Sequence, residues 1–423
     1  MAYRGALTEA SAAMNDSPMI FPSQELSQRV RNTLWTFVVI GAIMFAASLV
    51  LGYAQRAWQI YYVNFVLWTA IAQGGVVFSA AYRMTNGTWG EPFRRTGEGM
   101  VSFLPVSFVL FIGVFLGRSE IYPWLHEATG KESWLNTPFF FARDAAVFLF
   151  MMWLSYKYVR TSLRPEVGRY QASLPEKFQS FVGRLTRNWE GDELENAKST
   201  SAMAKLVPAM LILFAVLYTL LGFDLLMSLA PRWYSTLYGW LFFLYGFYGA
   251  LVVITILAIA ARKAFRLETG FRTSQFHDLG RLVMGFCMLS GGFYWSQYLV
   301  IWYGNLTEEI PYLLVRFHNP LWAPLTWYYI VFAFFFPLAI FLSKRAKEKP
   351  AILVVVASII LSSLFVERFL AVAPFLWHES TFPFGVMEMF VSLAFAAGFA
   401  LAWFKFISMV PLISTSTKHV HSG

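Results

Sequence analysis

Long apolar stretches, separated by polar connections, take up most of this 423-residue chain. A helix needs about 20 apolar residues to cross the hydrocarbon layer of a bilayer, and the layer offers no partner for an unpaired backbone group. The sequence therefore predicts an all-α integral membrane protein with about ten transmembrane helices. The expected spans are 33–53, 59–81, 100–117, 138–158, 206–229, 235–261, 279–303, 322–343, 351–375 and 383–408.

These spans divide the chain into five parts: an N-terminal tail, a membrane half of four helices, a loop, a membrane half of six helices and a C-terminal tail. Their expected bounds are 1–32, 33–160, 161–205, 206–408 and 409–423. In the loop, apolar residues recur at 178, 181, 182, 185 and 189 with basic residues between them. This spacing predicts an amphipathic helix lying on the membrane surface. The segment 89–95 is expected to be a shorter surface anchor.

Positive charge is distributed unevenly between the two sets of connections. Nearly all Lys and Arg residues lie in the tails and in the loops near 82–99, 159–205, 262–278 and 344–350. The positive-inside rule places both termini in the cytoplasm. This pattern, together with attraction to anionic lipid, accounts for the net charge of +9 without a nucleic-acid partner.

Cysteine and histidine are too few, or wrongly placed, for a redox metal. A single cysteine, Cys287, excludes an internal disulfide and a four-cysteine iron-sulfur cluster. The six His residues fall in loops, at span ends or in the tail, whereas a haem within a bundle needs His inside helices. The sequence predicts no metal or prosthetic group in this chain, and the pair His419 and His421 is interpreted as part of a solvated tail.

Ionisable residues occur within the outer half of several expected spans. They are Arg143, Asp144, Asp224, Glu367, Arg368 and Glu388. A charge inside a span costs several kcal/mol unless it is paired or lines a wet cavity. Either Arg143 pairs with Asp224 or Glu367 to hold helices together, or some of these groups accept and pass on protons.

Polar residues along the seventh span suggest a route from the cytoplasm. His277 and Asp278 open this span, Ser296 and Gln297 follow, and Gln73 in the second span adds a further polar group. A proton path is one interpretation. A helix cap at Asp278 and bonds between helices are the other. Aromatic residues in the outer loops fit a membrane belt or a slot for a flat quinone ring.

Four segments resemble a known family closely: WLNTPFFFAR at 134–143, GFDLLMSLAPRWYSTLYG at 222–239, HDLGR at 277–281 and SQYLVIWYGN at 296–305. They are similar to the NrfD/PsrC-like membrane subunits, and within that family to the ActF-type subunits of alternative complex III. The resemblance extends from about residue 30 to residue 412. Arg143, Asp224, His277 and Asp278 stand at motif positions.

The resemblance implies a bacterial inner-membrane subunit with two four-helix bundles, two peripheral helices and no prosthetic group of its own. The implied partners are a second NrfD-like subunit, an iron-sulfur subunit, multihaem cytochrome c subunits and a terminal oxidase. The implied substrate is a quinol, menaquinol in particular. We therefore expect quinol oxidation at the outer face, with Asp224 and Glu367 as proton acceptors that Arg143 keeps ionised. Two alternatives stay open: a scaffold or proton conduit whose sister subunit alone binds quinol, and a secondary transporter.

Overall fold

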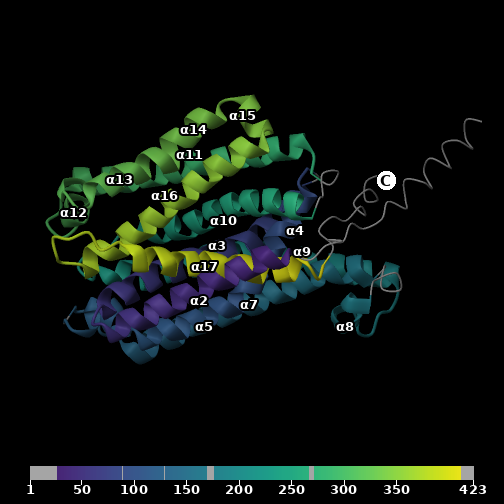
Figure 1. Ribbon diagram of the computed structural model, residues 1–423, viewed down its shortest axis with the longest axis horizontal. Helices are drawn as coiled ribbons and strands as arrows, with labels where there is room; N and C mark the ends of the chain where they lie inside the picture. Colours follow the sequence, from purple (N-terminus) through teal and green to yellow (C-terminus); the bar gives the residue numbers. More distant parts are fainter. Residues whose placement is uncertain (1–25, 88, 128, 169–175, 266–270, 411–423) are drawn as a thin grey trace, which may run out of the picture.

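The computed structural model describes residues 26–87, 89–127, 129–168, 176–265 and 271–410 (Figure 1). Within these ranges the chain forms helices and turns and no strand, which confirms the predicted all-α class. Nine helical stretches among the described residues are long and apolar enough to cross a membrane, so the chain is a multi-pass membrane protein. They are Gln28–Val50 (α2), Ala54–Met84 (α3), Glu91–Leu116 (containing α4 and α5), Thr137–Gly168 (α7), Asp192–Leu229 (containing α9), Thr236–Ala264 (α10), Ala323–Phe341, Pro350–Leu376 (α16) and Val386–Ile407 (α17).

The one expected span not among these nine, the seventh (279–303), falls within α11 (Thr273–Gly304). This helix has 32 residues and packs against α10, but it is not among the nine apolar stretches. Ten crossings therefore stay a prediction. Helix α9 spans Asp192–Leu225. The remaining elements are shorter: α4 (Glu91–Gly99), α5 (Leu104–Leu116), α6 (Arg118–Ile121), α8 (Glu176–Leu185), α12 (Ile310–His318), α13 (Ala323–Ile330), a π-helical stretch (Val331–Phe335), α14 (Phe336–Phe341) and α15 (Lys344–Glu348).

Several helices continue beyond the apolar stretches that predicted them. α7 runs to Gly168 and α9 starts at Asp192, so both enter the segment 161–205 that was expected to be a loop. Hydropathy marks only the part of a helix inside the hydrocarbon layer, whereas residues such as Glu, Lys and Ala sustain a helix in water as well.

The amphipathic segment does form a helix, α8, but its apolar side packs on protein. Val182 and Leu185 are buried, and Trp189 beyond the helix lies against Gly168, where an added Cβ would be 2.1 Å from the indole ring. Trp189 is half-buried and rests partly on protein, because α7 extends far enough to offer it a surface. The side chains of residues 176–180 lie outside the described part.

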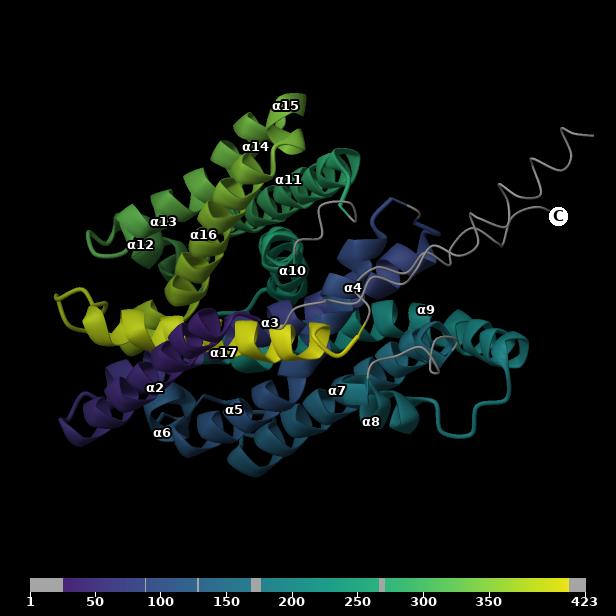
Figure 2. The ribbon, with the colours of Figure 1, turned by 45° about the vertical axis from the view of Figure 1, so that its right-hand side comes forward.

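Helix α3 is the centre of the molecule, since every residue of its most apolar 18-residue window is buried. It crosses α10 closely: a Cβ added at Gly74 would lie 2.6 Å from the carbonyl oxygen of Gly246. Small residues permit such close contacts between membrane helices. α3 also contacts α5, α9, α16 and α17, and α10 contacts α9, α11 and α16 (Figures 1 and 2).

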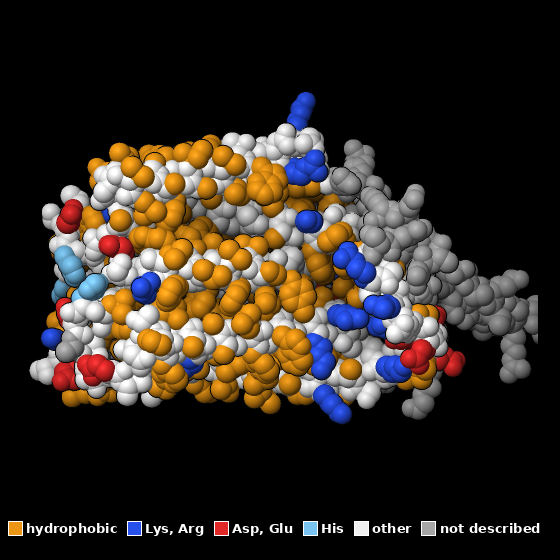
Figure 3. Space-filling view, turned by 90° about the horizontal axis from the view of Figure 1, so that it is seen from below, with side chains coloured by type: hydrophobic (Ala, Val, Ile, Leu, Met, Phe, Trp, Pro, Cys, Tyr) orange, Lys and Arg blue, Asp and Glu red, His pale blue; other side chains and the backbone are white. Residues whose placement is uncertain are grey.

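The surface carries a broad apolar band with charges toward its ends. In Figure 3, exposed Lys and Arg side chains gather mainly at one end of the band, and His side chains at the other. The basic end is the one at which α4 and α9 begin (Figure 1). This distribution is what the unequal charge of the connections predicted.

Candidate functional site

A buried ionic cluster lies in the halves of α7 and α9 that are away from the basic end of the molecule, and we call it the outer cluster. Arg143 Nε donates to Asp224 Oδ2 over 2.8 Å, and Trp134 Nε1 donates to Asp224 Oδ1 over 2.9 Å. The guanidinium also lies over the rings of Trp134 and Phe139, with its carbon 4.0 and 4.5 Å from the centroids. Of the two partners that the sequence suggested for Arg143, Asp224 and Glu367, the structure shows Asp224.

Asp144 is wholly buried and close enough to Asp224 for the two carboxyl groups to interact electrostatically. Within the described part of the chain, neither oxygen of Asp144 meets a donor, and Nη1 and Nη2 of Arg143 have no acceptor. One cation therefore faces two carboxyl groups. This set is neutral only if one carboxyl carries a proton, and neutrality matters because an uncompensated charge is costly inside a span. The geometry suits a site that holds and exchanges one proton.

Glu367 and Arg368 form a separate pair in α16, with Arg368 Nη1 3.3 Å from Glu367 Oε2. Arg316 is close enough to Glu367 to interact with it electrostatically, and its Nη2 donates to the carbonyl oxygen of Leu370 over 2.8 Å. The expectation that Arg143 also keeps Glu367 ionised is therefore wrong, because the cations beside Glu367 are its neighbour in sequence and a residue of α12.

Glu388 has a third environment. Its carboxylate accepts from Arg56 Nε over 2.8 Å and from the backbone N–H of Gly385 over 2.7 Å. It thus caps the start of α17 and ties this helix to α3. The six ionisable residues identified in the expected spans thus belong to three separate groups, because helices at one depth can face different neighbours.

The basic half of the molecule contains an ionic network that the sequence analysis missed. Glu98 is wholly buried, and its Oε1 accepts from Arg94 over 2.6 Å, from Ser162 over 2.6 Å and from Ser79 over 3.0 Å. Arg95 contacts the other oxygen of Glu98. The full network adds Arg83, Glu91 and Glu166.

This network joins α3, α4 and α7 and contains three Arg and three Glu side chains, so its formal charges cancel. The segment 89–95, expected to be a surface anchor, is instead largely buried: Arg94 and Arg95 are 3% and 1% exposed. The spacing of Arg94 and Arg95 ahead of Glu98 by four and three positions was the available signal, since such pairs meet on one helix face.

Polar groups continue from this network toward the outer cluster along α3 and α7. Ser79 Oγ lies 2.8 Å from the hydroxyl of Tyr158, and Gln73 Nε2 donates to Ser155 Oγ over 2.9 Å. A cavity of about 10 Å³ follows, lined in part by Gln73, Thr69 and Ser107. The hydroxyls of Thr69 and Ser107 have no partner among the described residues, and the space suits about one water molecule. We call this series the α3–α7 polar track.

The cavity also touches Phe148 of α7, four residues from Asp144. Four residues correspond to about 6 Å along a helix, a gap that a water molecule and a side-chain rotation can bridge. Gln73 thus belongs to a track between α3 and α7 and not to the path expected along α11.

The expected path along α11 is discontinuous. His277 and Asp278 lie together at its start, with Nδ1 3.6 Å from Oδ1. Gln297 is buried, but Ser296 is exposed and bonds only to the carbonyl oxygen of Gly292 in its own helix, over 2.8 Å. Adjacent residues of a helix point about 100° apart, so these two cannot serve one path.

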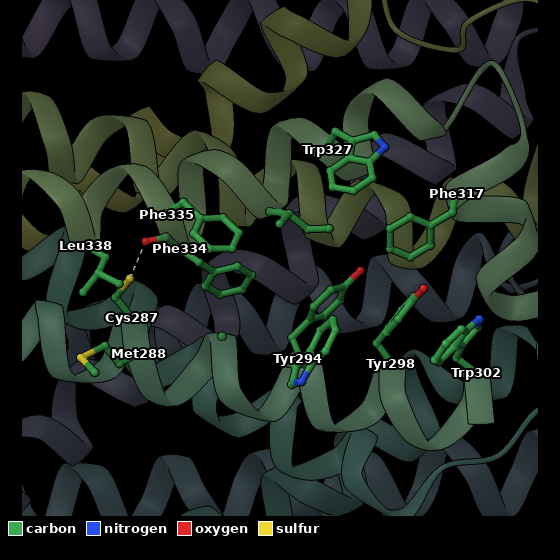
Figure 4. A pocket seen from close by; sticks show the side chains of 13 residues that line it. Cys287, Met288, Tyr294, Tyr298, Trp302, Phe317, Trp327, Phe334, Phe335 and Leu338 are labelled. Atoms are coloured by element: carbon green, nitrogen blue, oxygen red, sulfur yellow. Dashed lines mark hydrogen bonds between the residues drawn. The ribbon is translucent and has the colours of Figure 1, made fainter. Parts of the chain in front are cut away.

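An aromatic groove of about 600 Å³ lies between α11 and the run from α13 to α14 (Figure 4). Tyr294, Tyr298 and Trp302 line one side, facing Phe317 and Trp327 (Figure 4). Glu367 lies close enough to Tyr294 to interact with it electrostatically. The volume and the apolar lining with a few hydroxyls are typical of a site for a flat organic ring.

The π-helical stretch forms the inner wall of this groove. A π-helix leaves carbonyl groups without their usual partners, and here Cys287 Sγ donates to the carbonyl oxygens of Ala333 and Phe334 over 3.4 and 3.3 Å. The hydroxyl of Tyr248 also donates to Ala333, over 3.1 Å. Cys287 is therefore a structural partner of the π-helix.

In the part of the chain that the structure describes, no three His, Cys, Asp or Glu side chains gather closely enough to hold a metal ion. His419 and His421 lie outside the described residues. A scan against protein-family models finds no match for this chain, and a search of curated proteins finds none either.

Proposed function

We propose that this chain is a proton-transferring membrane subunit of a quinol-oxidising respiratory complex of the alternative complex III type. The observation that carries the proposal is the buried Asp144–Asp224 pair beside a single guanidinium, that of Arg143. Oxidation of a quinol to a quinone releases two electrons and two protons. The electrons leave to iron-sulfur and haem-bearing partner subunits, and the protons need acceptors in the outer half of the membrane.

The α3–α7 polar track supports the proton-transfer part of this proposal. Its groups run from Glu98 to within about 6 Å of Asp144 along the helix. Buried polar groups in membrane spans commonly mark proton relays. The contacts among α3, α5, α7 and α9 support one of the two expected four-helix bundles. Contacts of α10 with α11 and α16, and of the run from α13 to α14 with α11 and α16, support the other, with α2 and α17 at the periphery.

The aromatic groove supports quinol binding by this chain and not by a sister subunit alone. A quinol ring in the groove would lie near Tyr294 and Tyr298, and Glu367, which interacts electrostatically with Tyr294, is a candidate proton acceptor. Glu367 Oε2 accepts no hydrogen bond within the described structure. The second candidate function, a secondary transporter, lacks a comparable observation, because the ionic groups lie off the bilayer centre, where transporter sites usually lie.

The test uses the chain purified in mild detergent with whatever subunits accompany it. We expect haem that is reducible by menaquinol, together with iron-sulfur and second NrfD-like subunits identified by mass spectrometry. The Asp144→Asn variant of the assembled complex should oxidise menaquinol at least about 10²-fold more slowly, the lower end of what a positioned acid or base contributes.

Glu388→Gln is the matched control, because it removes a buried outer carboxylate that serves only as a helix cap and ion pair. It should leave the rate close to that of the unmodified complex. A colourless protein without partners would overturn the quinol-oxidation proposal and direct attention to transport. Equal rates for Asp144→Asn and the unmodified complex would remove Asp144 from the proton path.

A further inference from the structure

A basic groove lies between α7 and α9, outside the site described above. Two adjoining cavities of about 560 and 260 Å³ share Lys198 and Ala202 in their linings. The first is also lined by Lys157, Lys205 and Leu206. The second extends the groove to Arg160, Thr161, Arg164, Pro165, Glu195 and Ser199.

The charges in this groove do not cancel. Glu195 is occupied by Arg164, which donates to it over 2.7 and 2.6 Å, and Lys198 lies 2.6 Å from Glu190. Lys157 and Lys205 are exposed and have no acidic partner within the described structure. The groove therefore keeps an excess of positive charge, contributed chiefly by these two lysines and Arg160.

The depth of the two lysines matches the level of lipid phosphates. Lys157 follows the first residue of α7 by 20 positions, and Lys205 precedes the last residue of α9 by 20. At 1.5 Å per residue each lies about 30 Å from the outer end of its helix, which is about the thickness of the hydrocarbon layer. Both ammonium groups thus reach the opposite boundary of the bilayer.

Farther into the membrane, the same faces of α7 and α9 carry exposed apolar side chains. Phe150 and Trp153 lie on α7 about two turns and one turn outward from Lys157, and they are 42% and 54% exposed. Ile212 and Val216 lie on α9 in line with Lys205, and they are 63% and 59% exposed. A ligand with an anionic head and apolar chains would find complementary chemistry along the whole length of this face.

We propose that this groove binds an anionic phospholipid, with a phosphate between Lys157 and Lys205 and acyl chains along the apolar faces of α7 and α9. Basic pockets between membrane helices on the positively charged side are suited to such headgroups. The lipid would join two helices of the outer cluster, since α7 carries Arg143 and Asp144 and α9 carries Asp224. The proposal does not depend on quinol oxidation.

The experiment titrates the purified chain, with its accompanying subunits, with dioleoyl phosphatidylglycerol or dioleoyl phosphatidylcholine and measures bound lipid by native mass spectrometry. We expect preferential binding of phosphatidylglycerol. The double variant Lys157→Gln/Lys205→Gln should bind it about 30-fold more weakly, the factor expected for loss of two lysines near an anionic headgroup. The control Arg281→Gln/Lys344→Gln removes two basic residues that are 66% and 76% exposed elsewhere on the described surface, and it should bind as the unmodified protein does.

Three results would overturn the proposal: equal binding of the two lipids, equal weakening in the double variant and the control, or displacement of the lipid by millimolar inorganic phosphate, which would indicate a site for the free anion. The charge-preserving variant Lys157→Arg/Lys205→Arg separates loss of charge from loss of folding. It should retain the preference for phosphatidylglycerol, and its failure to do so would count against a purely electrostatic headgroup site.

Discussion

Replacement of Glu98 by Gln should be among the most destabilising single changes in this chain. Glu98 is wholly buried and accepts from Arg94, Arg95, Ser79 and Ser162. The amide keeps the volume but loses one negative charge, so the network would hold three Arg against two Glu. Removing one partner from a buried ionic network typically costs about 3 to 5 kcal/mol. We expect a loss in that range.

The measurement is reversible unfolding in mixed micelles of increasing dodecyl sulfate fraction, followed by far-ultraviolet circular dichroism. Glu348→Gln is the matched control: Glu348 is 35% exposed and lies 3.8 Å from Lys344, and an exposed pair contributes about 0 to 1 kcal/mol. A similar small loss in both variants would refute the reasoning that the Glu98 network is desolvated and stabilises the packing of α3, α4 and α7.

Two further predictions concern the groove and an outer loop. Gly291→Leu should abolish cross-linking of the groove by a photoreactive azidonaphthoquinone, because a Cβ at Gly291 already lies 3.2 Å from Phe334. The control Gly292→Leu should not, since a Cβ at Gly292 meets nothing within 4 Å. Equal cross-linking of both variants would exclude the groove as the quinone site. The carboxylate of Glu132 accepts hydrogen bonds from the backbone N–H groups of Glu132 itself, Gly130 and Thr129, in decreasing order of effect. These hydrogen bonds hold the pKa of Glu132 below its ordinary value of 4.5. The hydrogen bonds to this carboxylate should therefore order the loop fully above pH 4.5, and the loop should lose that order as the pH falls through the lowered pKa. Protection of the Gly130 amide from hydrogen exchange should decrease over the same pH range. Loss of protection on raising the pH would contradict the prediction.

Hydropathy was sufficient to predict the class of fold and most of the spans, because the cost of an unpaired backbone group in lipid leaves few solutions. It could not give the ends of α7 and α9, since polar residues outside the bilayer extend a helix without a hydropathic signal. It also left α11 uncertain as a span. This helix carries His277, Asp278 and Gln297, which lower its apolar character without interrupting the helix.

The candidate site was predicted by residue type and depth but not by grouping. Asp144, Asp224, Glu367 and Glu388 were all identified as costly residues in the outer half, yet which of them share a site depends on rotation about each helix and on the choice of neighbours. Glu98 escaped notice because it falls in the connection 82–99, outside the expected spans, whereas the structure includes it in the buried helix α4. Its partner Glu166 comes from a different span, and one sequence carries no signal for such a pairing.

Charge balance gives different expectations for the two buried ionic groups. The Glu98 network is balanced, so removing one charge should lower stability. The outer cluster has two carboxyl groups for one guanidinium, so Asp144→Asn removes the group that must otherwise carry a proton. We therefore expect Asp144→Asn to change the unfolding free energy by less than about 1 kcal/mol, or to raise it, while it slows quinol oxidation, as expected where a residue is kept for chemistry at some cost in stability. The same micelle titration measures this difference. A loss of about 3 kcal/mol or more, comparable with that expected for Glu98→Gln, would mean that Asp144 holds α7 and α9 together as a structural group, and the slower oxidation would then be a consequence of altered packing.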